Sequence, residues 1–159
     1  MGQDLTIEAE IRTGGTVTGP LTEAGPYLRS RTSAPGDGII GGTSAGYWVQ
    51  LRSNGQVRVR RLNPYATIAF SAPNPAFDPA MFHRLSATAR GETLQVSVDG
   101  KAVTFDQAGA AVTAVRLAPE WENLTPKGKN RGAAGIAFGA ESNRNQASGQ
   151  QVRQVRVVR

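Results

Sequence analysis

Cysteine is absent from the sequence, and histidine occurs once among its 159 residues. The lack of cysteine excludes disulfide bonds and zinc sites built on thiolates. The single histidine, His83, is not accompanied by a Gly-x-Ser-x-Gly run, so nothing indicates a serine nucleophile activated by a base. The aspartates are scattered and form no calcium-loop pattern. We therefore expect no cofactor, while a structural calcium ion held partly by backbone carbonyls stays open.

Long apolar runs are also missing. No stretch approaches the roughly 18 apolar residues that span a bilayer, and no basic-then-apolar signal segment opens the chain. We expect no membrane partner. A strand-like run begins almost at once, at Asp4–Arg12. We therefore expect residues 1–159 to form a single domain that is excised from a larger protein.

Helical periodicity is the third absence, because no segment of ten or more residues shows it. Apolar and polar residues alternate instead, as in Leu5–Arg12, and Asn54-Gly55 and Asp99-Gly100 are strong hairpin-turn signals. Counting the short alternating runs between turn signals predicts about ten to twelve strands. The predicted fold is all-β, a two-sheet antiparallel jelly-roll β-sandwich. The principal expected strands are Asp4–Arg12, Tyr27–Arg31, Tyr47–Arg52, Val57–Leu62, Tyr65–Ser71, His83–Ala89, Leu94–Val98, Ala102–Phe105, Ala114–Leu117, Ala134–Phe138 and Val152–Val158.

Lysine is scarce, and arginine supplies 15 of the 18 basic residues. The formal net charge is +6 and the sequence pI is about 10.5. Charge of this size reports on solubility and non-specific anion binding more than on a particular ligand. We therefore do not expect a nucleic-acid partner. Arginine is favoured where planar, bidentate hydrogen bonding is useful, although a genome rich in G and C would enrich it as well.

The arginines form rows along three expected strands. In each row the side chains are two residues apart and therefore share one face of the strand, while the opposite face is mostly apolar. The rows consist of Arg29 and Arg31, then Trp48, Gln50 and Arg52, then Arg58 and Arg60.

If these three strands are neighbours, their polar faces merge into one surface. Guanidinium groups can donate hydrogen bonds to sugar hydroxyls, and the C–H face of a sugar can pack on a tryptophan ring. We expect Trp48 to be the stacking plate and Arg29, Gln50, Arg52 and Arg58 to be donors, with Arg31, Arg60 and Trp121 as second choices. An ordinary solvent-facing sheet, in which arginine stems cover apolar surface, remains an alternative.

One segment offers a pair of carboxylates. In Glu120-Trp121-Glu122 the two acids flank an aromatic residue, and an extended backbone would place both acids on the same side. Most glycoside hydrolases catalyse their reaction with two carboxyl groups. The chain could therefore be an enzyme with Glu120 or Glu122 as general acid/base, although we favour a binding function.

Several runs, in their order and spacing, resemble the concanavalin A-like lectin/glucanase domains. The similarity lies in three groups of residues: the opening runs Asp4–Arg12, Tyr27–Arg31 and Gly46–Leu51, the runs Phe82–Leu85 and Leu94–Lys101 with the Val-Asp-Gly turn, and the closing runs Gly135–Phe138 and Val152–Val158. The resemblance implies that Val152–Val158 is the last strand and pairs near the first. The resemblance implies a jelly roll with a ligand groove on its concave sheet. The Glu-x-Asp-x-x-Glu or Glu-x-Asp-x-Glu signature of the glucanases is absent.

Two branches of that superfamily are similar to this chain. Gly46–Arg61 resembles the sugar-binding module attached to levanases. Tyr47 and Val49-Gln50-Leu51 resemble a strand of the 3-keto-disaccharide hydrolases, but Gln151–Arg159 lacks the Phe-Arg-Asn core of their last strand. The resemblance thus implies a carbohydrate-binding module of a secreted or periplasmic glycan-processing protein, or else a glycoside hydrolase.

Overall fold

A computed structural model describes residues 4–31, 45–62, 65–117, 133–140 and 149–159. Within these ranges the chain forms thirteen β-strands and no helix, so no helix there could cross a membrane. The strands are β1 Leu5–Arg12, β2 Thr22–Arg31, β3 Ala45–Arg52, β4 Val57–Leu62, β5 Tyr65–Phe70, β6 His83–Arg90, β7 Thr93–Val98, β8 Lys101–Ala102, β9 Phe105–Gln107, β10 Ala110–Val112, β11 Ala114–Arg116, β12 Ala133–Ala140 and β13 Gln151–Val158.

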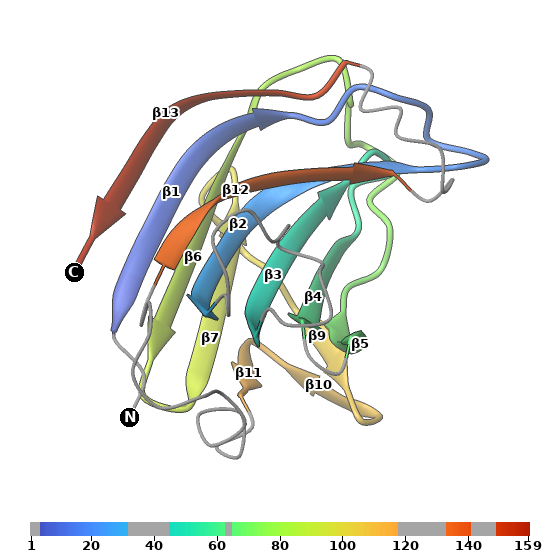
Figure 1. Cartoon of the computed structure of the whole chain (residues 1–159). Helices are drawn as coiled ribbons and strands as arrows, with labels where there is room; N and C mark the ends of the chain where they lie inside the picture. The colour runs from blue at the N-terminus through green and yellow to red at the C-terminus, as the bar shows by residue number, and fades with distance from the viewer. Residues whose placement is uncertain (1–3, 32–44, 63–64, 118–132, 141–148) are drawn as a thin grey trace.

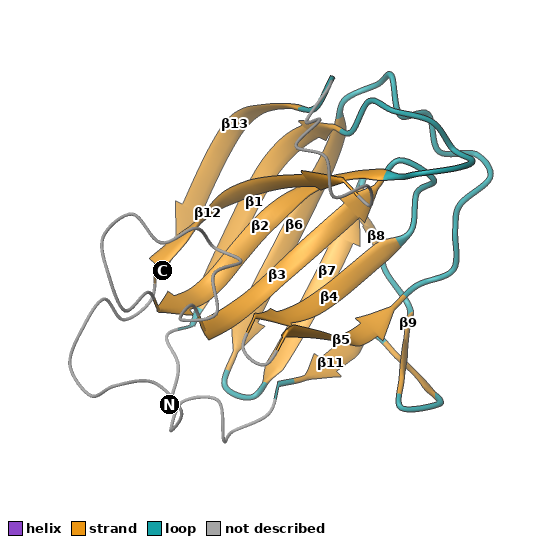
Figure 2. Cartoon of the chain, turned by 45° about the vertical axis from the view of Figure 1, so that its right-hand side comes forward, coloured by secondary structure: helices purple, strands orange, loops and turns teal. Residues whose placement is uncertain are grey.

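The strands build two sheets that pack face to face (Figures 1 and 2). Sheet A has the order β11-β7-β6-β1-β13, with β8 paired to β7. Sheet B has the order β10-β9-β5-β4-β3-β2-β12. Every pair of neighbouring strands is antiparallel. The predicted all-β, two-sheet jelly-roll sandwich is confirmed.

The core lies between the sheets and follows from the alternation in the sequence. In β1 the apolar residues Leu5, Ile7, Ala9 and Ile11 are buried, while the polar residues between them are half-buried on the other face. Apolar residues of β3 and β4 meet them from sheet B. Burial of this apolar surface is the main force that holds the two sheets together.

One strand is longer than the sequence indicates. The stretch from Thr13 to Gly25 reads as a loop because it is rich in glycine, threonine and proline, yet β2 begins at Thr22. Strand β12 pairs with β2 along this stretch, with Phe138 opposite Ala24 and Ala140 opposite Thr22. Tertiary pairing therefore overrides a local turn signal, and it brings Glu23 into sheet B.

Candidate functional site

The outer face of sheet B, which points away from the core, carries the arginine rows. Strand β3 lies between β2 and β4, so the predicted adjacency of the three strands is confirmed. Residues directly opposite one another in an antiparallel pair share a face. Gln50 lies opposite Arg58, Trp48 lies opposite Arg60, and Glu23 lies opposite Arg52.

Three buried residues, Glu23, Gln50 and Arg52, and the half-buried Arg58 form a hydrogen-bonded group on this face, which we call the buried polar network. The Gln50 amide donates to Glu23 Oε1 at 2.9 Å and accepts a hydrogen bond from Arg58 Nε at 2.7 Å. Arg58 Nη2 closes the ring by donating to Glu23 Oε2 at 2.8 Å. Charge-assisted bonds of this kind are stronger than bonds between neutral groups. The network therefore fixes the orientation of the Arg58 guanidinium.

Arg52 shares the same carboxylate. Its Nε lies 3.5 Å from Glu23 Oε2, and its Nη1 donates to Gln56 Oε1 at 2.6 Å. Desolvation lowers the pKa of both Arg52 and Arg58 below the ordinary value, and the charge of Glu23 counteracts this shift in each case. The network thus holds two guanidinium groups around one carboxylate.

The expected stacking role of Trp48 is wrong, because its ring has no exposed surface. It packs in a small apolar cluster with Leu62, Ala137 and Tyr27, and its Nε1 donates to Gly25 O at 3.2 Å. Gln50 is also 0% exposed and Arg52 is only 6% exposed. Alternation identifies the face on which these side chains lie, but it does not show what covers that face.

Arg29 also departs from the expectation. Its Nη2 lies 3.8 Å from Asp4 Oδ1, next to the start of β1 in sheet A. The register of β2 shifts between Leu28 and Arg31, and Arg29 has a left-handed φ of +51°. A bulge of this kind breaks the alternation of side chains and redirects them.

The remaining predicted residues lie at or beyond the limits of the described chain. Arg31 belongs to β2, and its backbone pairs with Ala45. Glu120, Trp121 and Glu122 lie outside the described residues. Within the described ranges no group of three or more His, Asp or Glu side chains is placed to hold a metal ion.

The part of this face that remains open lies along β4 and β5, and we call it the open strip: Arg58, Arg60, Tyr65, Thr67 and Phe70. Tyr65 is 44% exposed and Phe70 is 45% exposed. Phe70 lies opposite Arg58, and the Arg60 guanidinium carbon lies 4.4 Å from the centre of the Tyr65 ring. Two accessible aromatic rings therefore stand beside two half-buried guanidinium groups.

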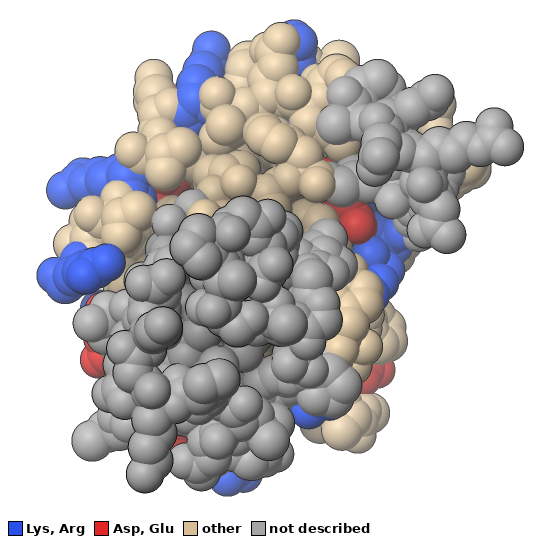
Figure 3. Space-filling view, in the orientation of Figure 1, with Lys and Arg blue, Asp and Glu red and all other residues tan. Residues whose placement is uncertain are grey.

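The sequence analysis did not select Tyr65, Phe70 or Glu23. Tyr65 could have been found, because Tyr65 and Thr67 alternate with less polar residues on the strand that follows Val57–Leu62, whereas alternation alone places Phe70 on the opposite face. A β-bulge in the β4–β5 pair, between Val59 and Arg60, moves Phe70 onto the face of Tyr65. On the face shown in Figure 3, the Lys and Arg side chains of the described residues lie at separate places.

The fold is similar to that of solved structures. The carbohydrate-binding module CBM66 from Bacillus subtilis matches with a TM-score of 0.56 and 14% identity, over 98% of this chain and 75% of that one. A β-glucanase from Bacillus licheniformis has a TM-score of 0.43 and 15% identity, over 91% and 68% of the two chains. A structure described as a native glycosidic hydrolase has a TM-score of 0.42 and 12% identity, over 84% and 62%. No protein-family model and no curated protein sequence matches.

Proposed function

We propose that this domain binds carbohydrate on the outer face of sheet B and catalyses no reaction there. The open strip is the observation that carries this proposal. Exposed aromatic rings such as Tyr65 and Phe70 are suited to pack against the C–H face of a sugar. Arg58 and Arg60 beside them can donate hydrogen bonds to its hydroxyl groups. The jelly roll shared with the module from Bacillus subtilis is consistent with this function.

The buried polar network contributes to binding by holding Arg58 in place. A free arginine side chain loses considerable rotamer entropy when it binds a ligand. Because Arg58 already bonds to Glu23 and Gln50, that entropy is lost on folding and not on binding. We propose further that the domain is the sugar-binding part of a secreted glycan-processing protein, in the manner of the levanase-type modules.

A glycan array on the purified domain, followed by calorimetric titration of the glycans retained, tests the proposal. Phe70→Ala and Tyr65→Ala should each weaken binding about tenfold, which corresponds to about 1.4 kcal/mol. Met81→Ala, which removes another exposed apolar side chain, is the matched control and should bind normally. Failure of the array to retain any glycan, or equal affinity in all three variants, would refute carbohydrate binding at the open strip.

A further inference from the structure

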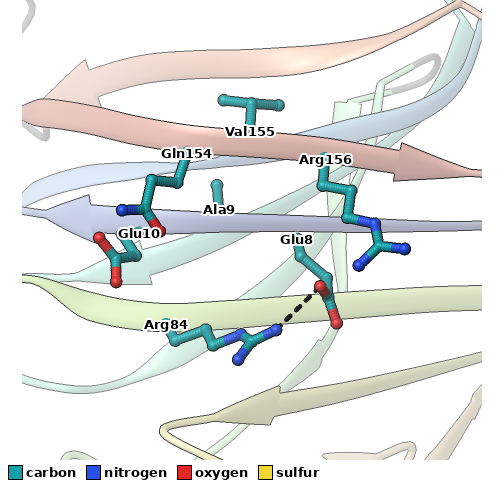
Figure 4. A pocket seen from close by; sticks show the side chains of 7 residues that line it. All are labelled: Glu8, Ala9, Glu10, Arg84, Gln154, Val155 and Arg156. Atoms are coloured by element: carbon teal, nitrogen blue, oxygen red, sulfur yellow. Dashed lines mark hydrogen bonds and ion pairs between the residues drawn. The ribbon is translucent and has the colours of Figure 1, made fainter.

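The outer face of sheet A, on the opposite side of the sandwich, contains a depression of about 390 Å³. Its volume is within the range of small-molecule sites, about 300–1,000 Å³. Three strands line it, β6, β1 and the edge strand β13, and Figure 4 shows their side chains gathered on one face of the sheet. The lining residues are Glu8, Ala9 and Glu10 of β1, Arg84 of β6, and Gln154, Val155 and Arg156 of β13.

A bulge in β13 shapes this depression. Glu8 lies opposite Arg156 and Glu10 lies opposite Arg153, so two residues of β13 face the single residue Ala9. One of them, Gln154, has a left-handed φ of +53°. This conformation costs a residue other than glycine about 1–3 kcal/mol, and such strain is concentrated at sites of function. The bulge directs the Gln154 amide toward Glu10 across the outer face (Figure 4).

The depression combines satisfied and unsatisfied polar groups. Arg84 Nη2 donates to Glu8 Oε2 at 3.0 Å, and Arg153 Nε donates to Glu10 Oε2 at 2.5 Å. In the described part of the chain, the side chains of Gln154 and Arg156 make no hydrogen bond or ion pair. A carboxylate can accept several hydrogen bonds, so both glutamates retain free acceptor capacity. The site therefore presents donors and acceptors together.

The charges of the lining residues themselves cancel, because Glu8 and Glu10 are matched by Arg84 and Arg156, while Arg153 pairs with Glu10 from outside the lining. A cation would be attracted by the two glutamates and repelled by the two arginines, and an anion would meet the reverse. A neutral molecule with several hydroxyl groups suits the site better, since each hydroxyl can donate to a carboxylate and accept from a guanidinium or an amide. A nearby ring, Phe82, is covered by the guanidinium groups of Arg12 and Arg153, at 5.5 and 3.9 Å from its centre. Recognition here therefore relies on hydrogen bonds and not on stacking.

We propose that this depression is a second binding site, which takes one neutral sugar unit by hydrogen bonding to Glu8, Glu10, Gln154 and Arg156. It is separate from the open strip and does not depend on it, because the outward side chains of β1 and those of β4 point in opposite directions from the core. A domain with both sites would contact glycan on two faces.

Titration of the isotope-labelled domain with glucose, galactose, fructose and mannose, followed by NMR, tests this site. Binding in the millimolar range should shift the side-chain signals of Gln154 and Arg156. Arg156→Ala should weaken binding about tenfold, while Arg159→Ala, which removes an exposed arginine outside the depression, should not. Phe70→Ala should leave this binding intact, which separates the second site from the open strip.

The variant Gln154→Gly provides an independent test of the role of the Gln154 side chain. Glycine adopts a left-handed φ without steric cost, so this variant should be more stable to urea than the wild type, yet it should bind sugar more weakly. Wild-type affinity in Gln154→Gly or Arg156→Ala would overturn the proposal. So would the absence of shifts with every neutral sugar, or tighter binding of glucuronate or glucosamine than of glucose.

Discussion

At the scale of single residues, Glu23 is the acid that holds the outer face of sheet B together. Its two carboxylate oxygens accept from Gln50 and Arg58, and Arg52 lies next to it. Removal of one partner from a buried ion pair leaves the other charge without compensation, which is costly. The stability of this face should therefore depend on Glu23 more than on any one arginine.

Replacement of Glu23 by Gln should lower the free energy of unfolding by about 3 kcal/mol. The substitution removes the negative charge and directs an amide N–H₂ group toward the donors of Arg58. Urea unfolding followed by tryptophan fluorescence measures the effect. Glu92→Gln, at an exposed position in a turn, is the matched control and should change stability by less than about 0.5 kcal/mol. A loss in Glu23→Gln as small as in the control would contradict the structural role of the network.

A second residue links stability to pH. Burial acts to raise the pKa of Asp99, but hydrogen bonds from the His83 ring, at 2.7 Å, and from the Arg84 backbone N–H, at 2.9 Å, outweigh it and hold this pKa below its ordinary value of 3.8. The charged carboxylate therefore stabilises the fold at pH values above the unfolded pKa of about 3.9. This contribution is lost as the pH falls through the lower, folded pKa.

Asp99→Asn should be less stable than the wild type near neutral pH, and the difference should shrink as the pH falls below about 4. Asparagine tolerates the left-handed φ of +51° at this turn, so the variant isolates the effect of charge. Urea midpoints measured over a series of pH values provide the comparison. A stability difference that does not vary with pH would show that the Asp99 charge is not involved.

At the scale of strands, β2 and β3 show what the sequence analysis predicted and what it missed. Alternation placed Trp48, Gln50 and Arg52 on one face of β3, and the register confirms this arrangement. It could not show that Trp48 is covered, because coverage comes from Leu62 and Ala137 on other strands. The local pattern determines orientation, and contacts between distant residues determine exposure.

Gly25 illustrates the same dependence on neighbouring strands. A Cβ atom at this position would collide with the backbone carbonyl oxygen of Val49 on β3. A backbone atom cannot move aside as a flexible side chain can. Only glycine, which has no Cβ atom, therefore fits at this position. Its own carbonyl also accepts the indole N–H of Trp48.

Gly25→Ala should therefore destabilise the domain by about 3 kcal/mol, at the upper end of the usual cost of overpacking. Gly109→Ala is the control, because a Cβ atom there meets nothing within 4 Å and only the left-handed φ of +84° is unfavourable. The control should lose about 1 kcal/mol. Equal urea midpoints for the two variants would mean that β2 can move away from β3.

At the scale of the molecule, the all-β class and the sandwich followed from alternation and turn signals spread along the chain. These local signals do not predict which strands pair when the strands are distant in sequence. Strand β1 lies between β6 and β13, and β12 pairs with β2. No local pattern encodes such pairings. The family resemblance implied that the last strand pairs near the first, which the pairing of β13 with β1 confirms, but it did not indicate the pairing of β12 with β2. The pairing of β13 with β1 also places Gln154 and Arg156 beside Glu8 and Glu10, a grouping that the sequence analysis did not anticipate.

The position of β1 also affects how the chain is made. Sheet A remains unfinished during translation until Gln151–Val158 has left the ribosome, because these residues form the neighbour of β1. Until then one edge of β1 has unpaired backbone groups, which can pair with other chains. Pairing between such distant segments is also slow. The nascent chain should therefore be most prone to pairing with other chains before Gln151–Val158 emerges.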